Sequence, residues 1–200
     1  MSTATVTLTH GPEELGEVRG RQRLAVLLLI AADAAFVLSL VFTYFYLRAL
    51  DTEGGWIPQD GRTVGPTAGW VIAGVAVLSA VAYRWGELGI RGGRRGRLLA
   101  GSSAALLLVL ADAALQTIQL GNLPMPTTDG AYASSFIVLA GYHLVHLVMT
   151  AVFGIGICNR ARLGRFSAAN HSHVEMVGLW WIWVAVSALL TAFTTSFVGT

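Results

Sequence analysis

Eleven of the thirteen basic residues lie on one side of a series of apolar stretches, and this asymmetry constrains the fold more than any other feature of the chain. Each stretch has about 20 residues or more, which is enough to cross about 30 Å of hydrocarbon as a helix. The five stretches are Leu24–Leu50, Pro66–Trp85, Leu98–Leu123, Tyr132–Cys158 and Val174–Val198. The sequence therefore predicts an all-α polytopic membrane protein, a bundle of five transmembrane helices.

The charged residues between the stretches alternate in sign. Arginines precede the first stretch, lie between the second and third, and lie between the fourth and fifth. The other two gaps are mainly acidic and contain Asp51, Glu53, Asp60 and Asp129. Because arginine-rich loops stay in the cytoplasm, we expect a cytoplasmic N-terminus and, after five crossings, an external C-terminus.

Composition supports a membrane protein. Charged residues make up 12% of the chain and hydrophobic residues 54%, whereas a soluble domain carries about 25% charged residues. The net charge of +2 then reflects the cytoplasmic loops, so we expect no nucleic acid partner. We expect a polar cytoplasmic tail at residues 1–23 and one membrane domain at residues 24–198.

Four acidic or histidine residues lie deep inside the apolar stretches, away from their ends, namely Asp33, Asp112, His143 and His146. A charged group at the bilayer centre costs at least about 2.5–3.5 kcal/mol, so such residues normally face protein and have partners. At 1.5 Å per residue, Asp33 lies roughly 14 Å from the cytoplasmic side and the two histidines roughly 18–22 Å from it. These overlapping depths predict that Asp33 can contact His143 or His146. A structural carboxyl and a site of proton uptake both stay open for Asp33.

A polar stripe follows one face of the third stretch. Asp112, Gln116 and Gln119 are spaced i, i+4 and i+7, so they share a helix face. Such a stripe typically joins a membrane helix to its neighbour through hydrogen bonds. Small residues also let membrane helices approach closely, and we expect this at Gly74, Gly141, Gly154 and Gly156.

The histidines do not predict a haem site. Two histidine ligands must reach a haem from opposing sides, but His143 and His146 lie on one helix. The other histidines lie outside the stretches and are His10, His171 and His173. The last two, together with Glu175, could bind a metal at the cytoplasmic surface or form an interfacial helix cap. We expect the cap, and no metal bound by this chain.

Three tryptophans lie deep in the last stretch rather than at its ends, where an interfacial aromatic belt would place them. They are Trp180, Trp181 and Trp183. We expect them to pack against another protein surface or against lipid chains.

These motifs resemble those of subunit III of the haem–copper terminal oxidases, in the five-helix form that lacks the first two helices of the seven-helix version. The segment Asp129–His146 reads DGAYASSFIVLAGYHLVH and is similar to the family's Gly-x-Tyr-Gly-Ser-x-Phe run followed by Gly-Phe-His-Gly-Leu-His. Asp33–Arg48 resembles the family helix with an acidic residue and then Tyr-Phe-x-x-Arg, and Leu115–Gln119 resembles the end of a later helix. Glu175 and the run Leu179–Val186 are similar to the family's last helix.

The chain departs from the family pattern at four polar positions. Asp33 and Gln119 each stand where the family has glutamate. The His and Asp of the family's Tyr-Trp-His-Phe-Val-Asp-Val signature are replaced by Ile182 and Ala185. Glu175 keeps the acidic position at the cytoplasmic end. The chain therefore resembles a divergent member.

The resemblance implies a non-catalytic subunit III of a cytochrome c oxidase in an aerobic respiratory chain. Its main partner would be oxidase subunit I, accompanied by subunits II and IV, and those partners would hold the haem and copper. The chain would bind phospholipid in a cleft between its helices and support proton uptake and the stability of subunit I. We expect no catalytic residue in it, and a multi-pass location in the plasma membrane of a prokaryote.

Other functions stay open at this point. The chain could be a subunit-III-like accessory protein of a nitric oxide reductase or an assembly protein of another respiratory complex. It could also be a small proton-coupled transporter that uses Asp33, Asp112 and His143 as a relay. A transporter should show helices broken near the middle of the membrane.

Overall fold

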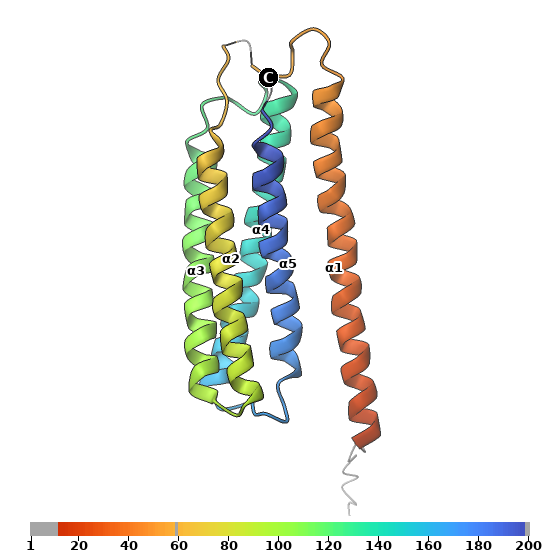
Figure 1. Cartoon of the computed structure of the whole chain (residues 1–200), viewed down its shortest axis with the longest axis vertical. Helices are drawn as coiled ribbons and strands as arrows, with labels where there is room; N and C mark the ends of the chain where they lie inside the picture. Colours follow the sequence, from red (N-terminus) through yellow and green to blue (C-terminus); the bar gives the residue numbers. More distant parts are fainter. Residues whose placement is uncertain (1–11, 59, 199–200) are drawn as a thin grey trace, which may run out of the picture.

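The computed structural model describes residues 12–58 and 60–198. Within these ranges the chain forms helices and no named strand (Figure 1): α1 Pro12–Ala49, α2 Pro66–Arg91, α3 Arg95–Gly121, α4 Gly130–Arg162 and α5 Ser172–Thr195. Each helix is long and apolar enough to cross a membrane. The predicted all-α bundle of five membrane-spanning helices is confirmed, whereas its orientation in the membrane stays a prediction.

The helices are longer than the apolar stretches because polar turns extend them. α1 begins at Pro12, so residues 12–23 of the predicted tail continue the first membrane helix. Proline suits the first helical turn, where its missing N–H would have no partner in any case. Arg21 also pairs with Glu17 one turn away at 2.9 Å, which supports the helix. Residues 1–11 of the predicted tail lie outside the described residues.

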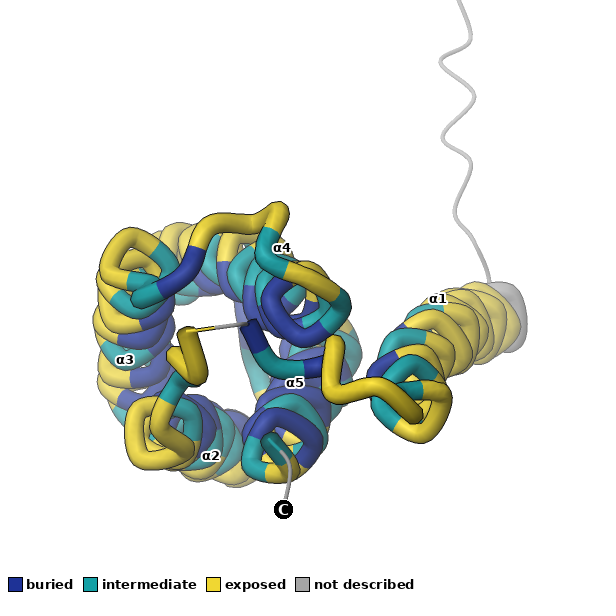
Figure 2. The backbone as a smooth tube through the Cα atoms, turned by 90° about the horizontal axis from the view of Figure 1, so that it is seen from above, coloured by how far each residue is buried: buried dark blue, intermediate teal, exposed yellow. Residues whose placement is uncertain are grey.

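Four helices form a closed ring and the fifth lies beside it (Figure 2). Around the ring, α2 packs on α3, α3 on α4, α4 on α5, and α5 on α2. Among the described helices, α1 contacts α4 and α5 and neither of the other two. It lies along the seam between two ring helices, so most of its surface faces away from the ring.

The connections gather at the two ends of the bundle (Figure 1), and these ends differ in charge. The arginine-rich end carries the α2–α3 connection, residues 92–94, and the α4–α5 connection, residues 163–171. The C-terminal end carries residues 50–65, residues 122–129 and the end of the chain.

Aromatic residues fasten the C-terminal end. Trp56 Nε1 donates to the carbonyl of Val198 at 2.7 Å, and the Tyr44 hydroxyl donates to the carbonyl of Phe197 at 3.1 Å. The ring of Tyr44 packs edge-on against Trp56 with 5.0 Å between centroids, and Tyr132 packs on both. These contacts hold α1, the 50–65 connection, α4 and the segment after α5 together.

A close crossing of α2 and α3 depends on two glycines. A Cβ on Gly101 would lie 2.6 Å from the Cα of Gly86 and 2.8 Å from the carbonyl oxygen of Ala82. The neighbours are backbone atoms, so a side-chain rotation cannot make room. Neither Gly86 nor Gly101 was singled out by the sequence analysis.

The glycines that were predicted to allow close approach divide into two groups. Gly154 does so, because a Cβ there would lie 2.9 Å from Trp181. The prediction is wrong for Gly74, Gly141 and Gly156, where a Cβ would meet no described atom of another element within 4 Å. A glycine permits a close crossing only on the face that meets a neighbour, and the sequence does not identify that face.

Replacing Gly101 by alanine should destabilise the bundle by about 1–3 kcal/mol, because the added methyl group overpacks a backbone contact. Gly74→Ala is the matched control and should be neutral or stabilising, since alanine favours a helix over glycine by about 1 kcal/mol. Midpoints of unfolding in sodium dodecyl sulfate would compare the two purified variants. Equal midpoints would contradict the close crossing of α2 and α3.

Candidate functional site

A carboxyl on α1 binds three side chains from two ring helices. The Tyr142 hydroxyl of α4 donates to Oδ1 of Asp33. Trp183 Nε1 of α5 donates to Oδ2 at 2.5 Å, and His146 Nε2 of α4 lies 2.7 Å from the same oxygen. We call these four residues the Asp33 cluster.

The helix geometry explains why these residues meet. Tyr142 and His146 are four residues apart, so they lie on one face of α4. Because α1 follows the seam between α4 and α5, Asp33 reaches that face and Trp183 together. The Asp33 side chain is 10% exposed and that of His146 is 2% exposed. A carboxylate can accept several hydrogen bonds on its two oxygens, so it suits this group of donors.

A second set of contacts fixes the imidazole of His146. Its ring centroid lies 4.6 Å from that of Tyr142 and 5.6 Å from that of Trp180. Trp180 Nε1 donates to Oγ1 of Thr150 at 3.0 Å, and that hydroxyl donates to the carbonyl of His146 at 2.7 Å. Packing and hydrogen bonds together hold the orientation of His146 toward Asp33.

His143 does not join the Asp33 cluster. Three residues of α-helix turn the chain by about 300°, so His143 and His146 point roughly 60° apart around α4. His143 Nε2 instead lies 3.6 Å from Oδ2 of Asp112 on α3, and both side chains are almost fully buried. The two histidines thus face two different carboxyl groups, and only His146 contacts Asp33.

The polar stripe of α3 bonds within its own helix. Asp112 and Gln116 are buried, and Gln119 is partly buried. Gln116 Nε2 donates to Oε1 of Gln119 at 2.9 Å. No hydrogen bond from Asp112 to another helix occurs within the described residues. The stripe therefore differs from the predicted set of interhelical bonds.

The tryptophans pack inside the protein, so the prediction of an outside surface is wrong for two of them. Trp180 and Trp181 are buried. Trp181 stacks on Tyr83 with 4.4 Å between ring centroids, and its Nε1 donates to Ser79 Oγ at 2.7 Å. The glycine at position 154 leaves the space that the indole of Trp181 enters. Trp183 is partly buried and turns toward Asp33.

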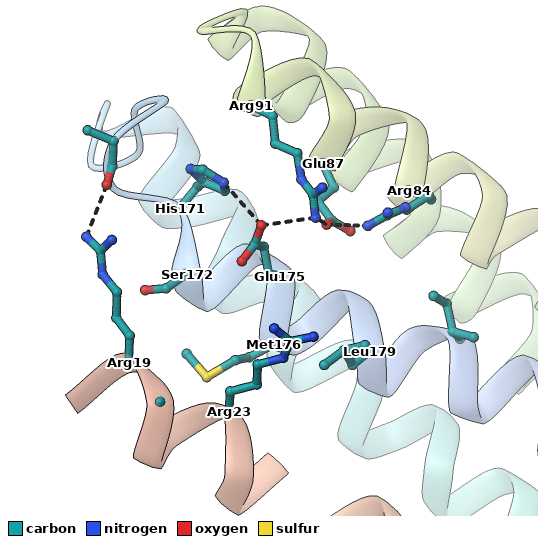
Figure 3. Close-up of a pocket in the computed structure, with 13 residues that line it drawn as sticks. Arg19, Arg23, Arg84, Glu87, Arg91, His171, Ser172, Glu175, Met176 and Leu179 are labelled. Carbon is teal, nitrogen blue, oxygen red and sulfur yellow. Dashed lines mark hydrogen bonds and ion pairs between the residues drawn. The ribbon is translucent and has the colours of Figure 1, made fainter. Parts of the chain in front are cut away.

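A pocket of about 570 Å³ opens at the arginine-rich end between α1, α2 and α5 (Figure 3). Inside it, Oε1 of the buried Glu87 pairs with Arg84 and with Arg91, the latter at 2.7 Å. Glu175 pairs with Arg91 at 3.0 Å and with His171 at 3.3 Å. The pocket exists because α1 contacts α5 but not α2 among the described helices.

The predicted helix cap at the start of α5 has a different geometry. His171 occupies the N-cap position without a side-chain capping bond, and Glu175 lies in the first helical turn. A carboxylate is favourable there because it faces the positive end of the helix dipole. In residues 12–58 and 60–198, no group of three His, Cys, Asp or Glu side chains is placed to share a metal ion.

The sequence analysis did not predict the roles of three residues, two in the Asp33 cluster and one in the pocket at the arginine-rich end. Tyr142 lies one turn before His146, and that i, i+4 spacing was a usable signal. Glu87 lies three residues after Arg84 and four before Arg91, which is the spacing of helical ion pairs. Trp183 had no comparable signal, because its role depends on the position of α1.

Almost the whole chain matches one known protein family. A model of the family "Cytochrome c oxidase subunit III" matches residues 5–199, almost the whole chain. The chain belongs to the cytochrome c oxidase subunit III family. The resemblance drawn from its sequence motifs is thereby confirmed.

Curated members of the subunit III family are similar at modest identity. The cytochrome c oxidase subunit 3 of Pylaiella littoralis is 26% identical over 182 residues, which cover 88% of this chain and 66% of the relative. Those of Danio rerio and Marchantia polymorpha are each 27% identical over 169 residues, covering 82% of this chain. The matches span 64% and 63% of these two relatives. This chain therefore spans slightly less than two thirds of each relative's length.

Three of the four positions at which the chain departs from the family pattern lie in different surroundings. Asp33, in place of the family's glutamate, is the centre of the Asp33 cluster. Ile182 is 44% exposed and lines the pocket at the arginine-rich end, whereas Ala185 is buried. Of the two apolar residues that interrupt the resemblance, one thus lies on the pocket wall and the other in the packed interior.

Removing the acceptor should destabilise the contact of α1 with the ring. Asp33→Leu leaves the partly buried Tyr142 and Trp183 donors without a partner, at up to about 1–3 kcal/mol each, the cost for a buried group. Asp33→Asn keeps one carbonyl oxygen and should have a smaller effect. Thermal unfolding midpoints in detergent should fall in the order wild type, Asn, Leu.

Ser39→Ala is the control, because the Ser39 hydroxyl bonds within α1 to the carbonyl of Ala35 at 2.8 Å. That variant should unfold like the wild type. If Asp33→Leu did so too, the Asp33 cluster would have no structural role.

Proposed function

We propose that this chain is a non-catalytic subunit III of a haem–copper terminal oxidase, of the cytochrome c oxidase class, in an aerobic respiratory chain. The family match over residues 5–199 carries the proposal. The site geometry supports it, because His143 and His146 face two carboxyl groups rather than a common ligand position. They do not fit a haem held between opposing histidines.

In this role the chain would bind oxidase subunit I, with subunits II and IV in the same complex. The name of the relatives, cytochrome c oxidase subunit 3, supports a complex of several subunits. Large apolar side chains are exposed along α1, among them Leu28 and Phe42, and such a surface suits a neighbouring membrane subunit or lipid. The haem and copper would belong to the partners, whose proton uptake and stability this subunit would support.

The helices favour this role over that of a transporter. Each of α1 to α5 is one continuous helix from its first residue to its last. Transporters of the kind considered above build their sites from helices broken near the middle of the membrane. The Asp33 cluster also resembles a structural joint, since its carboxyl is held by three side chains.

A tagged chain, extracted from its native membrane in mild detergent, should copurify with a haem–copper subunit. The purified complex should show a haem spectrum and consume oxygen when given a reduced electron donor. Nitric oxide reduction without oxygen consumption would instead favour an accessory protein of a nitric oxide reductase. Copurification without any haem would overturn the proposal.

Asp33→Asn separates two roles within that complex. A purely structural carboxyl predicts normal oxygen consumption and normal proton pumping once the complex has assembled. A complex that assembles fully and consumes oxygen but pumps fewer protons would place Asp33 in proton uptake.

We place the arginine-rich end in the cytoplasm and the chain in the plasma membrane of a prokaryote. The orientation is supported by the eleven arginines at that end. All thirteen basic residues are arginine, which suits a coding sequence rich in G and C, as in many bacterial chromosomes. A reporter domain that works only outside the cytoplasm should be active when fused after Thr200, and one that works only in the cytoplasm should be inactive there. The opposite result would reverse the proposed orientation.

The pocket at the arginine-rich end is our proposed phospholipid site. Four arginines and two glutamates line it, so its charge favours an anion. Its α5 wall includes Met176, Leu179 and Ile182, which follow one another along the helix. Figure 3 shows Arg19 and Arg23 on α1 opposite this wall. A phosphate head group would lie among the arginines and an acyl chain along the apolar wall.

The double substitution of Arg19 and Arg23 by glutamine should weaken retention of anionic phospholipid. Each basic residue near a membrane surface contributes about 1 kcal/mol, so two contribute about 2 kcal/mol, or close to thirtyfold in affinity. Lipid extracted from the purified complex and quantified by mass spectrometry would measure the loss. The matched control replaces Arg162 and Arg165, at the same end but outside the pocket. Equal lipid content in both variants would contradict the site.

A further inference from the structure

Asp112 and His143 form a buried polar pair that lacks hydrogen bonds. Neither oxygen of the Asp112 carboxyl and neither nitrogen of the His143 ring has a hydrogen-bond partner among the described residues. The closest approach, Nε2 to Oδ2, is 3.6 Å, which is too long for a direct hydrogen bond. Buried polar groups normally have a partner, either protein or ordered water. The pair therefore needs a further group between or beside its members.

A small cavity borders the histidine of this pair. It has a volume of about 10 Å³ and lies between all four ring helices. His143, Gln116 and Gln119 line it, together with mostly apolar residues of α2, α4 and α5. This volume is about the smallest that holds one water molecule, and a buried water needs two to four polar partners. The histidine and the two glutamines supply such partners.

We propose that the ring interior holds an ordered water molecule bound to His143 and to the amide of Gln116. A water molecule donates two hydrogen bonds and accepts two, so it can serve an imidazole nitrogen and an amide together. Both residues line the cavity, and Asp112 lies one turn before Gln116 on α3. No enzymatic step is involved, and the inference does not depend on the oxidase proposal.

The site is distinct from the Asp33 cluster. His146 bonds directly to Asp33 at 2.7 Å, and it points roughly 60° away from His143 around α4. Gln119 lies seven residues beyond Asp112, roughly 10 Å closer to the C-terminal end. The polar stripe of α3 thus runs along the proposed water site toward the C-terminal end of the bundle.

Water-edited solid-state NMR of the intact complex in lipid bilayers would test the proposal. The ring nitrogens of His143 should receive magnetisation from water protons, whereas those of His146 should not. His173, which is exposed on α5, is the positive control. A signal at His173 together with none at His143 would overturn the water site.

A cavity-filling substitution provides the second measurement. A Cβ on Gly69 would lie 3.7 Å from Thr195 Oγ1 and 3.8 Å from Ala192 Cα, and both residues also line the cavity. These are ordinary contacts, so Gly69→Ala should fold and remove the water signal at His143. Gly74→Ala, on the same helix with open space around it, should leave the signal unchanged.

A density map of the wild-type complex, at a resolution that shows ordered water, would decide the case even if Gly69→Ala failed to fold. Water density within hydrogen-bond distance of His143 and Gln116 is the expected result. A direct Asp112–His143 hydrogen bond without water density would refute the proposal.

Discussion

Away from its two ends, α1 is held to the ring by the hydrogen bonds of one carboxyl group. In a bilayer, apolar helices gain little from contacting each other rather than lipid, so close packing and hydrogen bonds decide which helices associate. α1 lies outside the four-helix ring and exposes many of its large apolar side chains. At mid-span, Asp33 ties it to α4 through Tyr142 and His146 and to α5 through Trp183. Without this acceptor, the seam would offer α1 mainly dispersion contacts at that depth.

The five helices could be predicted because an apolar run and a change in loop charge mark each of them. Depth along a helix follows from a constant rise per residue, so the sequence also brought Asp33 to the level of His143 and His146. Which histidine it meets depends on helix rotation and on which helices are neighbours. Neither the rotation of a helix nor its neighbours can be inferred from an almost uniformly apolar pattern. The separate pairing of His143 with Asp112 therefore became visible only in three dimensions.

The tryptophans show the same limit in another way. Their depth in the last apolar stretch suggested an outside surface. Trp181 enters the ring because Gly154, on a different helix, leaves space for its indole. Trp183, two residues further on, points to the opposite side of α5, where α1 brings a carboxyl to it. Each role is set by a residue distant in the chain, and no local pattern around Trp181 or Trp183 records it.

The attachment of α1 has a mechanical consequence at the arginine-rich end. Arg19 lies fourteen residues before Asp33, roughly 21 Å along the helix. A tilt of about 5° around Asp33 would move Arg19 by about 2 Å and leave the distances at Asp33 almost unchanged. Arg19 already spans the pocket mouth to the carbonyl of Ala169 at 3.1 Å. The tilt of α1 relative to the ring therefore determines the width of the pocket mouth at the arginine-rich end.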